Sequence, residues 1–127
     1  MRKLFAIFSF FLMADQTTAA EYFCSVDKKW SNGSQYSSED LLKWKFSVKI
    51  DDEGNDAALF RCSYATSVEA VTCDRYEADF ITQDTLGNKK YYYFRGQFDV
   101  QLFTNLHFIE NNGRGDIATG KCEFISP

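Results

Sequence analysis

The chain has 127 residues, of which 18 are acidic and 14 are Lys or Arg, and its net charge is −4. An acidic chain repels phosphate backbones and anionic lipid headgroups, so this charge excludes nucleic acid and disfavours binding to an anionic membrane surface. The length is typical of one domain, and aromatic residues, at 17% of the chain, supply the volume for one core.

Residues 1–20 are typical of a secretory signal peptide. Arg2 and Lys3 precede an apolar run over residues 4–13, and small residues follow near the expected cleavage site. We expect cleavage after Ala20, with Ala19 as the alternative. The apolar run is too short to span a bilayer, so we predict an exported protein without membrane insertion, located in a bacterial periplasm or outside the cell. Residues 21–127 then form a single disulfide-stapled β domain.

In the first half of this domain, alternating apolar and polar residues predict antiparallel strands. A short strand covers residues 21–26, and a short helix over residues 38–43 is capped by Ser37 or Ser38. Residues 44–50 alternate as a strand with one apolar face, and the apolar-free segment 51–56 is expected to be a loop. Strands over residues 57–64 and 71–81 follow; the alternation slips in the second, which predicts a β-bulge near Asp74 and Arg75.

In the second half, residues 89–103 are predicted to form one long strand that bends at Gly96. Its alternation assigns Tyr92 and Phe94 to the core. A strand over residues 106–110 and a last strand over residues 117–125 flank a glycine-rich hairpin connection. The pattern therefore predicts an all-β fold: a small antiparallel barrel or sandwich of six to eight strands, with two disulfides and at most one short helix.

Four cysteines, an even number in an exported domain, predict two disulfides and leave three connectivities open. We favour Cys62–Cys73, because these residues flank one predicted hairpin, and Cys24–Cys122, because they lie near the two ends of the domain. A zinc site is disfavoured, since there is no C-x-x-C motif and only one histidine. We expect no metal and no cofactor.

The sequence shows no catalytic constellation, so we predict that the protein is not an enzyme. His107, the single histidine, lies within a predicted strand, and no G-x-S-x-G motif is present. Carboxylate pairs could support hydrolysis, but the many acidic residues leave no pair that can be singled out. The acidic segment 51–56 could attract calcium, yet the EF-hand pattern fails because Lys49 occupies the first ligand position.

Two features are candidates for a binding surface. Tyr91, Tyr93 and Arg95 share the strand face opposite Tyr92 and Phe94, and tyrosines beside an arginine are common at interfaces; the alternative is that another layer packs over them. Arg114-Gly115-Asp116 spells RGD, either as an adhesion signal or as a turn in which glycine adopts positive φ. We favour the turn. The candidate binding surface comprises Tyr91, Tyr93, Arg95, Arg114 and Asp116.

Three short segments resemble the framework of periplasmic inhibitors of C-type lysozyme: EYFC at residues 21–24, KFSVKI at 45–50 and GKCEF at 120–124. The resemblance implies a small exported β-barrel that inhibits lysozyme. The family's Ser-Gly-rich segment ending in Arg-Tyr and its later Lys-Gly loop have no counterpart here, so the resemblance assigns no inhibitory residues.

These observations predict a secreted or periplasmic, non-catalytic binding protein that acts through a protein partner. Its sharpest form is an inhibitor of a cell-envelope-degrading enzyme such as lysozyme. One alternative is a calycin-like carrier of a small apolar ligand, because inward-facing aromatic residues can line a cavity as readily as fill one. The remaining alternative is an exported domain with carboxylate-based hydrolase activity.

Overall fold

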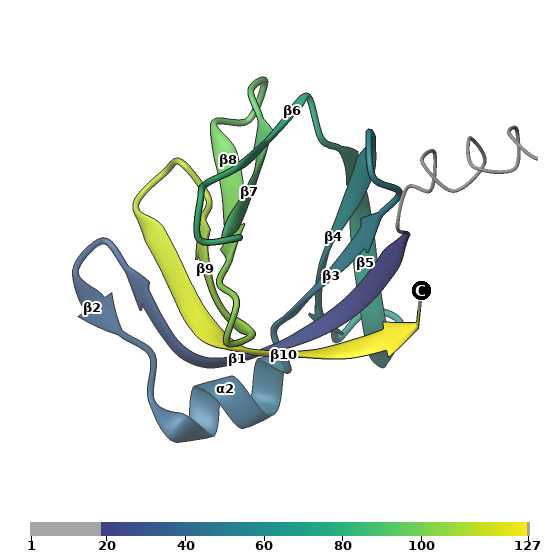
Figure 1. Ribbon diagram of the computed structural model, residues 1–127. Helices are drawn as coiled ribbons and strands as arrows, with labels where there is room; N and C mark the ends of the chain where they lie inside the picture. Colours follow the sequence, from purple (N-terminus) through teal and green to yellow (C-terminus); the bar gives the residue numbers. More distant parts are fainter. Residues whose placement is uncertain (1–18, 127) are drawn as a thin grey trace, which may run out of the picture.

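A computed structural model describes residues 19–126 of the chain, and the predicted signal peptide lies almost entirely outside the described residues. A single antiparallel sheet curls until its two wings face each other, with β1 and β10 at the base of the curl (Figure 1). The strands pair in the order β5-β4-β3-β1-β10-β9-β8-β7-β6, and β2 pairs only with β1.

The long central strands are β1 (Ala20–Ser31) and β10 (Asp116–Ser126). One wing contains β3 (Ser47–Asp52), β4 (Ala57–Ala65) and β5 (Ala70–Glu77). The other wing contains β6 (Phe80–Gln83), β7 (Lys89–Tyr93), β8 (Phe98–Leu102) and β9 (His107–Asn111). The two-residue β2 (Ser34–Gln35) and the helix α2 (Ser38–Trp44) lie between β1 and β3 in the chain.

The all-β class, the two disulfides and the single short helix are confirmed, but the strand count is wrong. The described residues form a 10-stranded sheet rather than six to eight strands. The sheet is one curled layer whose edges, β5 and β6, do not pair with each other, so it is neither a closed barrel nor a two-sheet sandwich.

The predicted strand over residues 71–81 is two strands, and the β-bulge near Asp74 is absent from it. β4 and β5 pair without a register shift from Ala58↔Glu77 to Ala65↔Ala70. The alternation slips because the apolar residues of β5 change faces: Tyr76 packs against the core, whereas Val71 and Cys73 lie on the opposite face. After β5 the chain leaves one wing and enters the other. The backbone N–H of Ala78 donates to the Ala57 carbonyl of β4, and that of Asp79 donates to the Tyr92 carbonyl of β7.

The predicted strand over residues 89–103 is also two strands, which form a hairpin instead of bending at Gly96. β7 and β8 pair from Lys89↔Leu102 to Tyr93↔Phe98. Gln97, at the end of the connection, has a φ of 56°. The predicted face assignment in β7 and at the residue after it is inverted: Tyr91 is fully buried, whereas Phe94 is 60% exposed. A reversal of chain direction within one apolar run cannot be read from alternation alone.

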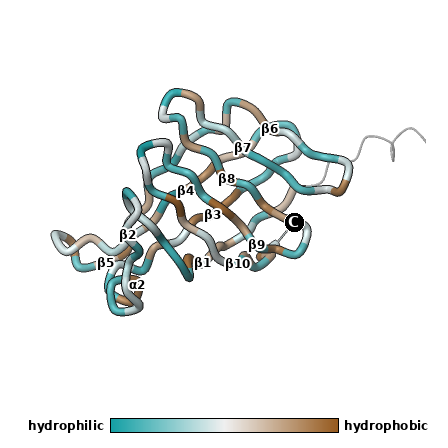
Figure 2. Tube along the Cα trace, turned by 90° about the vertical axis from the view of Figure 1, so that its left-hand side faces the viewer, coloured by the Kyte–Doolittle hydropathy of each residue, from teal (hydrophilic) through white to brown (hydrophobic). Residues whose placement is uncertain are grey.

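The core fills the space between the two wings. Figure 2 shows hydrophobic stretches along the strands, including β3 and β4. The side chains that meet in this core come from both wings and from β1 and β10; the largest that are fully buried are Tyr91, Phe108, Ile50, Leu59, Val48 and Val100. Their burial provides the main driving force for closing the curl.

Both predicted disulfides are confirmed. Cys24 and Cys122 are directly opposite each other in the β1–β10 pair, and their bridge spans a sequence separation of 98 residues. Cys62 and Cys73 are opposite each other in the β4–β5 pair, with a separation of 11 residues. One bridge therefore joins the two central strands, and the other fixes β5, an edge strand, to its neighbour.

The helix is confirmed, with Ser37 as its N-cap. The Asp40 backbone N–H donates to Ser37 Oγ (3.1 Å), and the Asp40 carboxylate accepts from the Ser37 backbone N–H, completing a capping box. Trp44 ends the helix instead of starting a strand, because Lys45 adopts the left-handed conformation with φ 49°. No residue of α2 is buried. The helix therefore lies against the outer face of the sheet without closing onto it.

Candidate functional site

A pocket of about 240 Å³ lies where the two wings face each other beside the turns that join β7 to β8 and β9 to β10. We call it the arginine pocket. Three of its side chains carry a positive charge, and three are aromatic. Its lining consists of Arg61 of β4, Tyr76 of β5, Phe98 of β8, the residues Tyr93, Arg95 and Gly96 around the β7–β8 turn, and Arg114 of the β9–β10 turn.

One of the three arginines has a carboxylate partner. Arg61 Nε donates to the buried Glu110 of β9 at 2.5 Å, and its guanidinium lies 4.9 Å from the ring centroid of Phe98. Within residues 19–126, Arg95 and Arg114 are both exposed and form no salt bridge. The pocket therefore holds one neutralised guanidinium and two that are free to bind an anion.

The aromatic walls of the pocket pack against one another. The Tyr76 ring lies 5.1 Å from the Tyr93 ring and 5.4 Å from the Phe98 ring, measured between centroids. A Cβ at Gly96 would meet the Tyr93 ring at 3.2 Å, so the glycine allows the turn to lie on that ring. These contacts hold the pocket in one shape before any ligand arrives.

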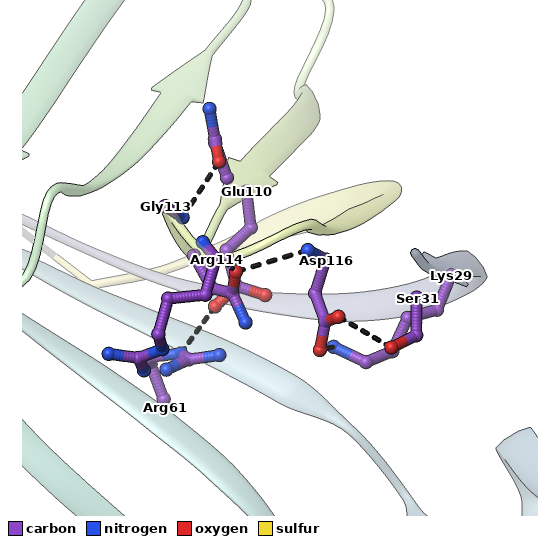
Figure 3. Close-up of polar contacts among 9 residues, drawn as sticks. Lys29, Ser31, Arg61, Glu110, Gly113, Arg114 and Asp116 are labelled. Carbon is purple, nitrogen blue, oxygen red and sulfur yellow. Dashed lines mark hydrogen bonds and ion pairs between the residues drawn. The ribbon is translucent and has the colours of Figure 1, made fainter. Parts of the chain in front are cut away.

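The β9–β10 turn is fixed by hydrogen bonds that its backbone donates to its own asparagine side chains (Figure 3). Asn111 Oδ1 accepts from the Gly113 backbone N–H at 2.8 Å, and Asn112 Oδ1 accepts from the backbone N–H groups of Arg114 (2.8 Å) and Asp116 (3.1 Å). Gly113 has a φ of 78°, and a Cβ there would meet the Gln97 carbonyl oxygen at 2.3 Å. The turn is therefore seated against the β7–β8 turn.

The hairpin interpretation of the RGD tripeptide fits this geometry. Asp116 begins β10, where its carboxylate accepts from Ser31 Oγ at 2.6 Å and lies 4.0 Å from Lys29 Nζ (Figure 3). The Gly115 carbonyl accepts from the Asn32 backbone N–H. An adhesion receptor can recognise RGD only on a projecting loop in which both charged side chains are free. Here Asp116 accepts a hydrogen bond from Ser31 of β1, and Arg114 lines the arginine pocket.

The structure brings together three of the five residues proposed for the binding surface. Tyr93, Arg95 and Arg114 line the arginine pocket. Asp116 lies in the same hairpin as Arg114 but is held by Ser31. Tyr91 is the residue that the structure places elsewhere: it has no exposed surface and belongs to the core.

Arg61 and Tyr76 are pocket residues that were not predicted from the sequence. A signal was present for Arg61, since it shares a strand parity with the buried Leu59, just as Glu110 shares one with the buried Phe108. A positive and a negative side chain, each on the buried parity of its strand, could have indicated an ion pair across the core. Tyr76 carried no such signal, because a tyrosine on the core-facing side of a strand fits a filled core as well as the wall of a pocket.

The exposed aromatic face of β6 and β7 differs from the predicted one. Phe80, Tyr92 and Phe94 form a cluster on it, with ring centroids separated by 5.8 to 6.4 Å. Phe80 and Phe94 are more than half exposed, and Lys90 Nζ lies 5.2 Å from the Tyr92 centroid. This cluster replaces the predicted row of Tyr91, Tyr93 and Arg95 as the aromatic surface of that wing.

A buried polar network lies away from the arginine pocket. Asp52 of β3 accepts hydrogen bonds from Tyr91 Oη (2.7 Å) and Lys89 Nζ (2.8 Å) of β7 and from the Gly54 backbone N–H (2.7 Å). Burial by itself would raise the pKa of Asp52, but these hydrogen bonds hold the pKa below its ordinary value. Burial, and then the bond to Asp52, raise the pKa of the Tyr91 hydroxyl, so it stays protonated and donates.

Other titratable side chains lie outside the arginine pocket and this network. Burial raises the pKa of Asp99 on β8, and Lys90, 3.9 Å away, opposes that rise. His107 is exposed on β9. In the part of the chain that the structure describes, no three His, Cys, Asp or Glu side chains are grouped so as to hold a metal ion. No helix there is long and apolar enough to cross a membrane.

Comparison of the chain with protein-family models, with curated proteins and with solved structures found no match.

Proposed function

We propose that this protein is a non-catalytic binding protein whose arginine pocket receives a carboxylate group of a protein partner. The observation that supports the proposal most directly is the convergence of Arg61, Arg95 and Arg114 with Tyr76 and Tyr93 on one pocket. Arginine and tyrosine are, with tryptophan, the residues enriched at energetically important interface positions. A guanidinium also binds a carboxylate through two parallel hydrogen bonds.

The size of the pocket argues for one group of a larger partner rather than a whole small molecule. Its volume of about 240 Å³ is below the range of about 300–1,000 Å³ that is usual for small-molecule sites. The core side chains that fill the space between the wings also favour this function over that of a carrier with an internal ligand. Because the chain as a whole has a charge of −4, the pocket is a local site for an anion on an acidic protein.

We further propose that the protein is exported. Two disulfides form in the structure, and they persist in oxidising compartments such as the periplasm or the extracellular space. The signal-peptide pattern of residues 1–20 supports the same location. Sequencing the N-terminus of the protein recovered from outside the cytoplasm tests this, and we expect it to begin at Glu21.

The pocket is tested by NMR titration of oxidised residues 21–127 with a short end-blocked peptide that contains one glutamate. We expect saturable shifts at Arg95, Gly96 and Arg114, and no such shifts with the glutamine version of the peptide. The double variant Arg95→Gln/Arg114→Gln should bind about tenfold more weakly. Arg75→Gln, which alters an exposed arginine paired with Glu77 on β5, is the matched control. Equal binding of the two peptides would refute the pocket as a carboxylate site.

The resemblance to lysozyme inhibitors supports the most specific version of the proposal, in which the partner is a cell-envelope-degrading enzyme. In an assay of cell-wall lysis by C-type lysozyme, we expect the oxidised domain to reduce the rate of lysis. Arg95→Gln/Arg114→Gln should abolish that effect, and Arg75→Gln should retain it. Unchanged lysis with the wild-type domain would exclude lysozyme as the partner, and the peptide titration would still decide the carboxylate proposal.

A further inference from the structure

A second hollow lies on the opposite, outer face of the sheet, between α2 and strands β1, β3, β4 and β5. We call this hollow of about 520 Å³ the helix groove. Its volume falls within the range of about 300–1,000 Å³ that is typical of small-molecule sites. Most of its lining is apolar, and these side chains are Phe23, Val26, Leu41, Leu42, Phe46 and Val71.

The apolar lining of the helix groove is uncovered. Leu42 is 77% exposed, Val71 46% and Phe23 37%, although all three face the same hollow. α2 has no buried residue, so its two leucines lie next to the sheet but are not buried against it. An amphipathic helix normally buries its apolar side, and exposed apolar side chains gathered in one hollow mark a binding site.

The charged side chains of the groove are both positive. Lys45 and Lys49 line it, and no acidic residue does. Lys49 Nζ lies 5.0 Å from the Phe60 ring centroid, and Lys45 Nζ lies 5.8 Å from that of Tyr64. Within residues 19–126, neither lysine forms a salt bridge. On a chain with a charge of −4, two unpaired ammonium groups at the edge of an apolar hollow are complementary to an anion with an apolar body.

We propose that the helix groove binds a monomeric anionic amphiphile with a single acyl chain, of the fatty-acid type. Its chain covers Phe23, Leu42 and Val71, and its carboxylate is held by Lys45 and Lys49. This site is separate from the arginine pocket and shares no residue with it. The apolar ligand of the carrier hypothesis is thereby moved from the inside of the curl to its outer face.

The test is titration of the oxidised domain with dodecanoate below its micelle concentration, followed by NMR. We expect saturable shifts confined to the groove, and binding of the uncharged dodecanol about tenfold weaker, because only the carboxylate interacts with the lysines. Lys45→Gln/Lys49→Gln should reduce the affinity for dodecanoate to that for dodecanol. Lys43→Gln, on the same helix but outside the lining, should leave it unchanged.

The apolar half of the site has a closely matched control pair. Leu42 and Leu86 are both 77% exposed, but only Leu42 lines the groove. Leu42→Glu should weaken dodecanoate binding at least about tenfold through lost contact and charge repulsion, whereas Leu86→Glu should not. Both variants should keep the wild-type unfolding midpoint, since neither leucine is buried.

Three outcomes would overturn the proposal: equal affinity for dodecanoate and dodecanol, unchanged binding by Leu42→Glu, or the absence of saturable shifts. A binding assay with vesicles that contain phosphatidylglycerol distinguishes binding of a monomeric ligand from binding to a membrane surface. Binding to these vesicles without binding to monomeric dodecanoate would assign the groove to a membrane surface instead. A dimer in analytical ultracentrifugation that Leu42→Glu dissociates would assign it to a second copy of the chain.

Discussion

The two halves of the curled sheet are stabilised by different means. The crosslinked half comprises β5, β4, β3, β1 and β10 and contains both disulfides. The uncrosslinked half comprises β9, β8, β7 and β6 and contains no cysteine, so it depends on the packing of residues such as Tyr91 and Phe108. Reduction of the disulfides should therefore destabilise the crosslinked half first, and substitutions in the core should destabilise the uncrosslinked half first.

The arginine pocket takes residues from both halves. Arg61 and Tyr76 come from the crosslinked half, while Tyr93, Arg95 and Phe98 come from the uncrosslinked half. Two polar contacts span the interior between them: Arg61 with Glu110, and Asp52 with Tyr91 and Lys89. The shape of the pocket therefore depends on how the two halves are placed relative to each other. The helix groove does not, because it is built from the crosslinked half and α2 alone.

The largest effect is expected from removing the disulfide between the central strands. Because Cys24–Cys122 spans 98 residues, the chain-entropy model gives a loss of about 5 kcal/mol for Cys24→Ala/Cys122→Ala. The same model gives about 3 kcal/mol for Cys62→Ala/Cys73→Ala, whose separation is 11 residues. Urea unfolding of both double variants measures the difference. Equal losses would show that the constraint on the unfolded chain is not what distinguishes the two bridges.

The next largest effect is expected from the core of the uncrosslinked half. Phe108 is 1% exposed, and Phe108→Ala should lower the free energy of unfolding by about 4 kcal/mol because it leaves a cavity between the wings. Phe94→Ala, at a side chain that is 60% exposed, should change it by less than about 0.5 kcal/mol. Thermal or urea unfolding decides, and similar losses in the two variants would contradict the packing of this half.

The crosslinked half was predictable from the sequence to a greater extent than the uncrosslinked half. Cysteine spacing identified both bridges, and the alternation of Val48 and Ile50 identified the core face of β3 correctly. In β7 the same reasoning assigned the wrong face, because seven consecutive aromatic or basic residues, 89–95, precede Gly96 in the turn to β8. When every residue is compatible with a strand, parity alone cannot reveal where the chain reverses.

The candidate site was predicted only in part, for a related reason. Tyr93, Arg95 and Arg114 were selected as an interface, yet they meet because two turns distant in the sequence contact each other through Gly113 and Gln97. The curl of the sheet then brings Arg61 against them. These are consequences of sheet topology, which short-range patterns do not encode.

The third prediction concerns the acidic contact between the halves. Asp52→Asn removes a buried carboxylate that accepts three hydrogen bonds, and it should lower the free energy of unfolding by about 2 kcal/mol at neutral pH. The folded-state pKa of Asp52 lies below its ordinary value of 3.8. Its contribution is therefore complete above that value and is lost as the pH falls through the lower, folded-state pKa.

This acid dependence can be measured with a matched control. Unfolding free energies recorded between neutral pH and about pH 2 should fall less steeply in Asp52→Asn than in the wild type at the acid end. Asp27→Asn, at an exposed carboxylate of β1, should retain the wild-type slope. An unchanged slope in Asp52→Asn would mean that the network does not couple the halves through a charged carboxylate.

The smallest effect is expected at the end of the β1–β10 pair opposite the disulfide. There, Ser31 Oγ donates to the Asp116 carboxylate at 2.6 Å. Ser31→Ala should therefore lower the free energy of unfolding by about 1 kcal/mol in a urea titration. Ser34→Ala, at an exposed residue of β2, is the control and should leave it unchanged. The result also bears on the RGD tripeptide. If Ser31→Ala were as neutral as the control, Asp116 would be energetically free of β1 and available to a receptor. A measurable loss shows instead that the aspartate is part of the sheet, which leaves Arg114 as the residue of that turn available for binding.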